Sequence, residues 1–80
     1  MMVAKILDTS QLKASDGNKV RVELLTMLRD FNKGRGVSSI GWENREIIKV
    51  VFSERAPQPA IDAFVKEATK KGVEVRDDQF

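Results

Sequence analysis

Eighty residues leave room for one domain, 1–80, because a chain of this length buries only about 60 to 65% of its unfolded surface. Hydrophobic residues make up 41% and charged residues 32%, which excludes an intrinsically disordered chain. Cysteine and histidine are absent, so disulfides, thiolate or imidazole metal ligands and the common nucleophile–base pairs are excluded.

Residues 2–7 form a short apolar run that predicts an opening strand. The next periodic stretch has two interpretations, because residues 19–24 alternate like a half-buried strand and could follow a hairpin turn. Over a longer window Val20, Leu24 and Leu28 share one helical face, and Gly34 is typical of a helix end. We therefore predict a helix over residues 18–33.

The middle of the chain predicts a β-hairpin. Residues 37–42 form one short strand, residues 43–45 a tight turn, and residues 46–52 a second strand. The second strand is apolar on both faces, which is typical of a central strand.

Two prolines, Pro57 and Pro59, break the chain before an amphipathic helix predicted over residues 60–71. Gly72 can adopt the left-handed conformation that ends a helix. Residues 73–77 alternate again and predict a last strand.

The resulting order, β-α-β-β-α-β, predicts an α+β fold of the ferredoxin-like type. In this two-layer sandwich both helices pack on one face of a four-stranded antiparallel sheet. The fold hosts many unrelated functions, so the site has to be argued from its residues.

The open face of such a sheet is a candidate partner-binding surface, and Lys5 and Leu7 join it if the first strand is phased that way. An apolar centre with a charged rim is typical of a protein–protein surface, including a two-fold homodimer. The candidate residues are Trp42, Arg45, Ile47, Lys49, Val51 and Arg76. Trp42 has two interpretations, an exposed partner anchor or a side chain that closes one end of the core, and the second is the commoner role.

A basic cluster around the first helix is a candidate phosphate-binding site. Its residues are Lys19, Arg29, Lys33 and Arg35. Two glycines beside Arg35 could let backbone N–H groups approach a phosphate. A solvated helix face is the commoner explanation, since neither a P-loop nor a dinucleotide-binding spacing is present.

These observations favour a non-catalytic protein-interaction or regulatory module that associates with itself or another chain through the open sheet face. We expect no enzyme activity, no cofactor and no metal. A nucleic-acid-binding protein that uses the basic cluster is the first alternative, although 14 basic against 12 acidic residues is a mixed charge. A small-ligand sensor is the second. No apolar run reaches the roughly 18 residues of a membrane span, so we expect a cytoplasmic protein.

Overall fold

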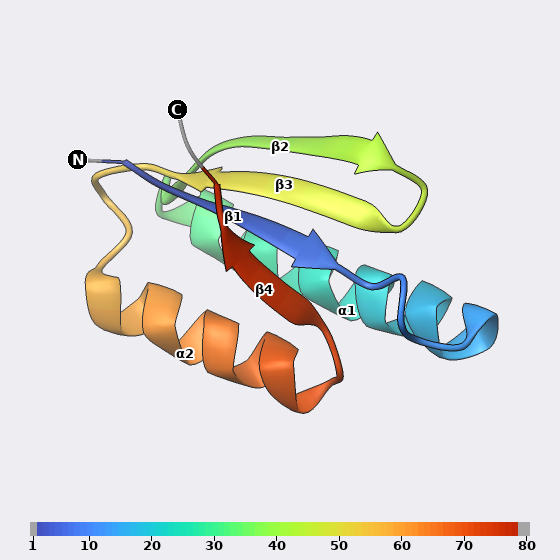
Figure 1. The fold of residues 1–80 in the computed structure, drawn as a ribbon. Helices are drawn as coiled ribbons and strands as arrows, with labels where there is room; N and C mark the ends of the chain where they lie inside the picture. Colours follow the sequence, from blue (N-terminus) through green and yellow to red (C-terminus); the bar gives the residue numbers. More distant parts are fainter. Residues whose placement is uncertain (1, 79–80) are drawn as a thin grey trace.

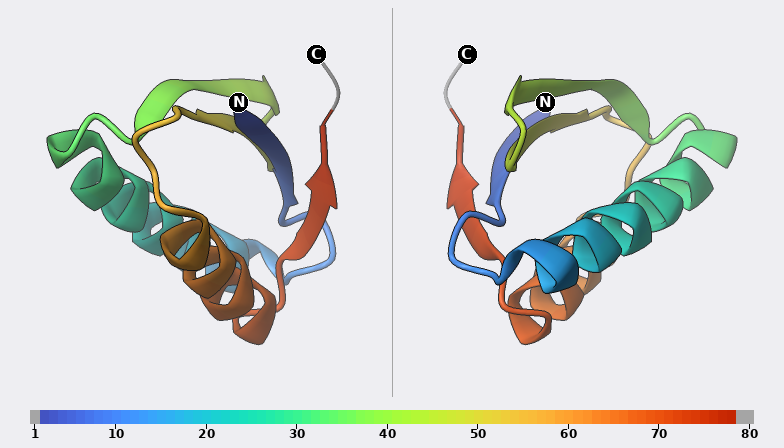
Figure 2. Two further views of the ribbon diagram at one scale, coloured as in Figure 1. Left: turned by 90° about the vertical axis from the view of Figure 1, so that its left-hand side faces the viewer. Right: turned by 90° about the vertical axis from the view of Figure 1, so that its right-hand side faces the viewer.

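The computed structural model describes residues 2–78, so residue 1 and residues 79–80 of the predicted domain lie outside it. Its elements are β1 (Val3–Asp8), α1 (Ala14–Lys33), β2 (Val37–Asn44), β3 (Ile47–Phe52), α2 (Gln58–Lys70) and β4 (Glu74–Asp77). The strands form one antiparallel sheet in the order β2-β3-β1-β4. Both helices cover the same face of this sheet (Figure 1, Figure 2). The predicted α+β, ferredoxin-like sandwich is confirmed.

Helix α1 packs on the core through one apolar side. Val20, Leu24 and Leu28 are buried along it, which confirms the helix over the strand alternative. The helix begins at Ala14, one turn before the predicted start. Gly17 is buried inside this extra turn, where a Cβ would come within 3.0 Å of the Arg21 guanidinium. The preference of the residues around Gly17 for a turn is thus overridden by packing.

The two faces of β3 are divided as predicted. Ile48, Val50 and Phe52 are fully buried against the helices, and the alternate residues are half-buried on the open face. The predicted phase of β1 is wrong. Leu7 lies opposite Ile48 in the β1–β3 ladder and is fully buried, and Lys5 lies opposite Val50, so both belong to the helix-covered face. The phase was ambiguous because β1 is apolar on both faces.

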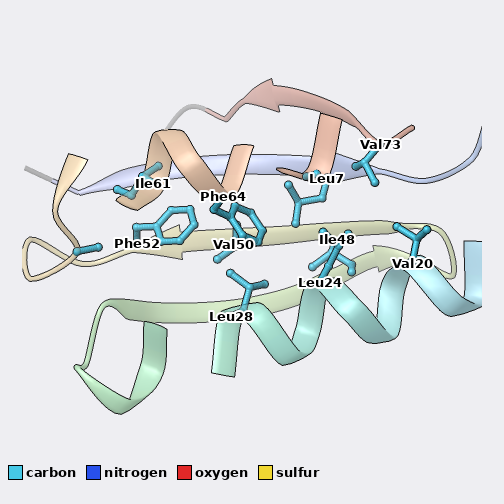
Figure 3. Packing of buried hydrophobic residues seen from close by; sticks show 12 residues of the cluster. Leu7, Val20, Leu24, Leu28, Ile48, Val50, Phe52, Ile61, Phe64 and Val73 are labelled. Atoms are coloured by element: carbon cyan, nitrogen blue, oxygen red, sulfur yellow. The ribbon is translucent and has the colours of Figure 1, made fainter. Parts of the chain in front are cut away.

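An aromatic cluster joins the two layers. Phe31 of α1, Phe52 of β3 and Phe64 of α2 meet edge to face, with ring centroids 5.1 to 5.9 Å apart. Aliphatic side chains from both helices and the inner strands fill the rest of the layer between helices and sheet (Figure 3). Burial of each such side chain contributes about 1.5 to 3 kcal/mol.

Helix α2 begins at Gln58, directly after Pro57, and ends at Lys70, within two residues of the predicted bounds. Gly72 adopts a φ of 88°, the left-handed conformation predicted for the helix end. Strand β4 begins one residue later than predicted, because Val73 is buried in the core before the strand starts. Across the described residues, neither helix is long and apolar enough to cross a membrane.

Candidate functional site

The outer strand β2 carries two large apolar side chains that the helices leave uncovered. Trp42 lies opposite Ile48 in the β2–β3 ladder, and Ile40 lies opposite Val50. Residues paired across an antiparallel ladder point to the same face, so Ile40 and Trp42 point to the helix side of the sheet. Yet Ile40 is 40% exposed and Trp42 is 51% exposed, whereas their partners are fully buried. We call these two side chains the Ile40–Trp42 surface.

This exposure corrects the interpretation of Trp42 as a residue that closes the core. The core ends at β3 on this side, because β2 reaches beyond the helix layer and every residue after Val37 in the strand is exposed. Figure 2 shows β2 at the sheet margin, with α1 diverging from it. Trp42 therefore offers an indole to solvent on the concave, helix side of the sheet.

The first half of α1 is held by a buried hydroxyl. Thr9 is fully buried, and its Oγ1 donates to the Glu46 carbonyl at 2.7 Å. The same oxygen accepts a hydrogen bond from Arg21 Nη1 at 2.6 Å. Because Glu46 lies in the β2–β3 turn, this chain of contacts ties α1 to the end of the sheet that carries Trp42.

The two flanks of α1 face different neighbours. Glu23 forms an ion pair with Lys71 just after α2, so α2 lies on that flank. Leu25 follows two positions later, which turns it by about 200° to the opposite flank. It is half-buried against the core and, with Arg21, borders the side of α1 that faces β2. The flank of α1 that is turned away from α2 thus carries one aliphatic and one cationic side chain.

The predicted partner-binding residues are not brought together as one set. Ile47, Lys49 and Val51 share the open face of β3, and Arg76 of β4 lies on the same face through its pairing with Ile6. Trp42 points to the opposite face. Arg45 begins the two-residue turn between β2 and β3, which starts two residues later than predicted because β2 extends to Asn44.

Charge pairs cover much of the open sheet face. Arg76 Nη1 lies 3.1 Å from Asp8 Oδ2 and 3.2 Å from a Glu74 carboxylate oxygen. Hydrogen bonds from the side chain and backbone of Ser10, assisted by Arg76, hold the pKa of Asp8 below its usual value of 3.8. Asp8 was not predicted as a site residue because the predicted first strand ended one residue before it, whereas β1 extends to Asp8.

The predicted phosphate-binding residues are also separated. Lys19 and Lys33 lie fourteen positions apart on α1, or roughly 21 Å along the helix axis. Lys33 pairs with Asp30 at 3.5 Å, and Arg29 is exposed on the helix surface. Arg35 lies beyond the helix end, beside Arg55, a residue that the sequence analysis did not select. The only signal for Arg55 in the sequence was its position two residues before Pro57.

A groove runs between the outer sides of α1 and α2. A hollow of about 420 Å³ in this groove is lined by Val22, Met27 and Thr26 of α1 and by Glu67 and Lys71. The ion pair between Glu23 and Lys71 forms part of its lining, and the hydrogen bond between the two lowers the pKa of Glu23 and raises that of Lys71. Val22, which the helix prediction left facing away from the core, is 65% exposed at this hollow.

Comparison with known proteins gives a match of structure but none of sequence. No protein-family model matches the chain, and no curated protein matches it significantly. The fold is similar to a crystal structure from Deinococcus radiodurans, provisionally named an antibiotic biosynthesis monooxygenase. That match has a TM-score of 0.57 and 8% sequence identity, and it covers 100% of this chain and 92% of the other.

This match corrects two predictions made from the sequence. The prediction of a non-catalytic interaction module that self-associates through the open sheet face is wrong, as is the prediction that the chain is not an enzyme, because the fold neighbour is named as a monooxygenase of antibiotic biosynthesis. The finding favours the small-ligand alternative instead. At 8% identity the likeness itself establishes that the two chains share the ferredoxin-like fold.

Proposed function

We propose that this protein binds a small, largely apolar organic molecule that contains an aromatic ring, on the Ile40–Trp42 surface. The observation that carries the proposal is the exposure of Ile40 and Trp42 on the helix side of the sheet. Ligand sites are lined mainly by apolar and aromatic side chains with a few polar groups. Trp42 and Ile40 supply the first kind, and we place Leu25 of α1 with them.

The physical reason is that the exposed surface of the indole is more stable in contact with an apolar ligand than with water. An aromatic side chain offers roughly 150 to 250 Å² of surface, and stacking of a second ring adds about 0.5 to 1.5 kcal/mol to the burial itself. A flat aromatic molecule between Trp42 and the Leu25 side of α1 would remove both from solvent. This predicts a preference for aromatic over purely aliphatic ligands of the same size.

Calorimetric titration with naphthol tests the proposal, and it does not depend on the tryptophan as a reporter. We expect saturable binding that weakens about tenfold in Trp42→Ala. Val22→Ala is the matched control, since Val22 is also an exposed apolar residue but lies on the outer side of the helix layer. Equal affinity in Trp42→Ala and the unchanged protein would contradict this site.

Oxidation of such a ligand is a second candidate function, and it rests on the name of the Deinococcus radiodurans fold neighbour. Oxygen uptake measured with an electrode after naphthol is added tests it. We expect uptake above that of a protein-free solution, and its reduction in Trp42→Ala. Binding without any oxygen uptake would leave the binding proposal standing and reject oxidation of this compound.

A further inference from the structure

A second hollow lies at the opposite end of the sheet from Trp42. It has a volume of about 360 Å³ and is lined by Met2, Arg35, Ser53, Glu54 and Arg55. These residues come from the position just before β1, the loop between α1 and β2, and the loop after β3, which meet at one end of the molecule (Figure 1). The hollow is thus built by three segments that are distant in sequence.

Ser53 fixes the two arginine-bearing loops relative to each other. Its N–H donates to the Gly36 carbonyl at 2.8 Å, and its Oγ donates to the Arg35 carbonyl at 2.6 Å. The Arg55 N–H donates to the same Oγ at 3.2 Å. One serine therefore binds the backbone of both arginines, so their side chains leave from a fixed base.

The backbone of Arg35 gives an independent indication that its side chain has a role. Its φ of 58° lies in the left-handed region, where a side chain costs free energy that glycine avoids. Gly34 and Gly36 stand on either side, and Gly34 has a φ of −92°. The strained position thus carries an arginine although glycine fits it better, and such strain is typical of functional sites.

The two guanidinium groups are available to a ligand. Within residues 2–78 neither Arg35 nor Arg55 forms an ion pair with a carboxylate. A guanidinium binds the two oxygens of a carboxylate through a planar fork of N–H groups. Glu54 also lines the hollow, so the lining side chains carry one net positive charge, which suits a singly charged anion better than a polyanion.

The apolar part of the lining comes from Met2, which is 47% exposed. An unbranched thioether side chain adapts to apolar groups of varied shape. From these observations we infer that the hollow between Arg35 and Arg55 binds a small monocarboxylate, with its carboxylate on the two guanidinium groups and a short apolar tail against Met2. This site is separate from the Ile40–Trp42 surface and does not rest on the function proposed for it.

The test is a titration of isotope-labelled protein with hexanoate, followed by amide chemical shifts. We expect saturable shifts at Gly36, Ser53 and Arg55, and a roughly tenfold weaker affinity in Arg35→Gly and Arg55→Gln. Arg35→Gly removes the guanidinium while glycine keeps the left-handed backbone, so the loop should stay folded. Arg29→Gln is the matched control, because it removes an exposed arginine elsewhere and should leave the affinity unchanged.

Two further ligands test whether the site requires both the carboxylate and the apolar tail. Hexanol has the same tail without the charge, and we expect it to cause no saturable shift at these amides. Inorganic phosphate should bind more weakly than hexanoate, because it lacks a tail and carries more negative charge beside Glu54. Phosphate that binds more tightly than hexanoate, or hexanoate binding that survives both arginine substitutions, would overturn the inference.

Discussion

Trp42 and Ile48 lie directly opposite each other in the β2–β3 ladder, yet Ile48 is fully buried and Trp42 is 51% exposed. The helix layer therefore ends between two neighbouring strands. Inside this limit the side chains hold the fold together, and outside it Ile40 and Trp42 are free to contact a ligand. Buried residues such as Ile48 therefore determine stability, whereas Ile40 and Trp42 carry the proposed function.

Substitution of the two partners should consequently have unequal effects on stability. Ile48→Ala removes a fully buried side chain and should lower the free energy of unfolding by about 2 to 5 kcal/mol. Trp42→Ala should cost clearly less, because half of the indole is already in water. Urea unfolding followed by circular dichroism measures both, and a Trp42→Ala protein as unstable as Ile48→Ala would show that Trp42 belongs to the core.

Arg35→Gly should leave the stability unchanged or raise it by up to about 1 kcal/mol, because glycine relieves the left-handed backbone but loses more chain entropy on folding. Arg35→Ala is the control, since it removes the same side chain and keeps the strain. The two variants should differ in thermal unfolding. Equal midpoints, or a marked loss of stability in Arg35→Gly, would mean that the arginine side chain stabilises the fold itself.

Thr9→Val should destabilise the protein by about 1 to 3 kcal/mol, because the Arg21 Nη1 group loses its buried acceptor and the Glu46 carbonyl keeps only the Thr9 backbone N–H. The shape of the side chain is retained, so the loss reports on the hydroxyl. Thr69→Val, the same change at an exposed position of α2, is the comparison. Denaturant unfolding that shows no difference between the two variants would argue against the tie between α1 and the β2–β3 turn.

Acid should weaken the fold partly through Asp8. Its pKa is lowered in the folded state, so its contribution is present above the unfolded value of 3.8 and is lost as the pH falls through the lower folded value. We expect Asp8→Asn to be less stable than the unchanged protein at neutral pH, with a difference that shrinks below about pH 4.

The control for this acid dependence is Asp30→Asn, because Asp30 is exposed and pairs with Lys33 on the surface. Thermal midpoints across the acid range should show the pH-dependent difference for Asp8→Asn only. A constant difference at every pH would indicate that the substitution acts through packing and not through the charge of Asp8.

Much of the fold could be predicted from sequence because several signals agreed. Val20, Leu24 and Leu28 repeat at helical spacing, the residues of β3 alternate, and Gly72 marks the end of α2. The start of α1 could not be predicted, since Gly17 has low helix propensity and its place is decided by the Arg21 side chain packed over it. Local preference and tertiary packing disagree there.

The sites were less accessible to sequence reasoning, for two physical reasons. The exposure of Trp42 depends on how far the helices extend over the sheet, which no local pattern records. The meeting of Arg35 and Arg55 depends on loops that Ser53 brings together across the sheet end. The sequence did identify Trp42 and Arg35 as candidates, but it placed each with the wrong neighbours.

The most direct test of the proposed function uses the single tryptophan of the chain, which gives one indole N–H signal. Titration with naphthol should move this signal saturably, together with the amide signals of Ile40 and Gly41 in β2. An indole signal that stays in place while naphthol moves signals elsewhere, or moves none, would contradict ligand binding at the Ile40–Trp42 surface.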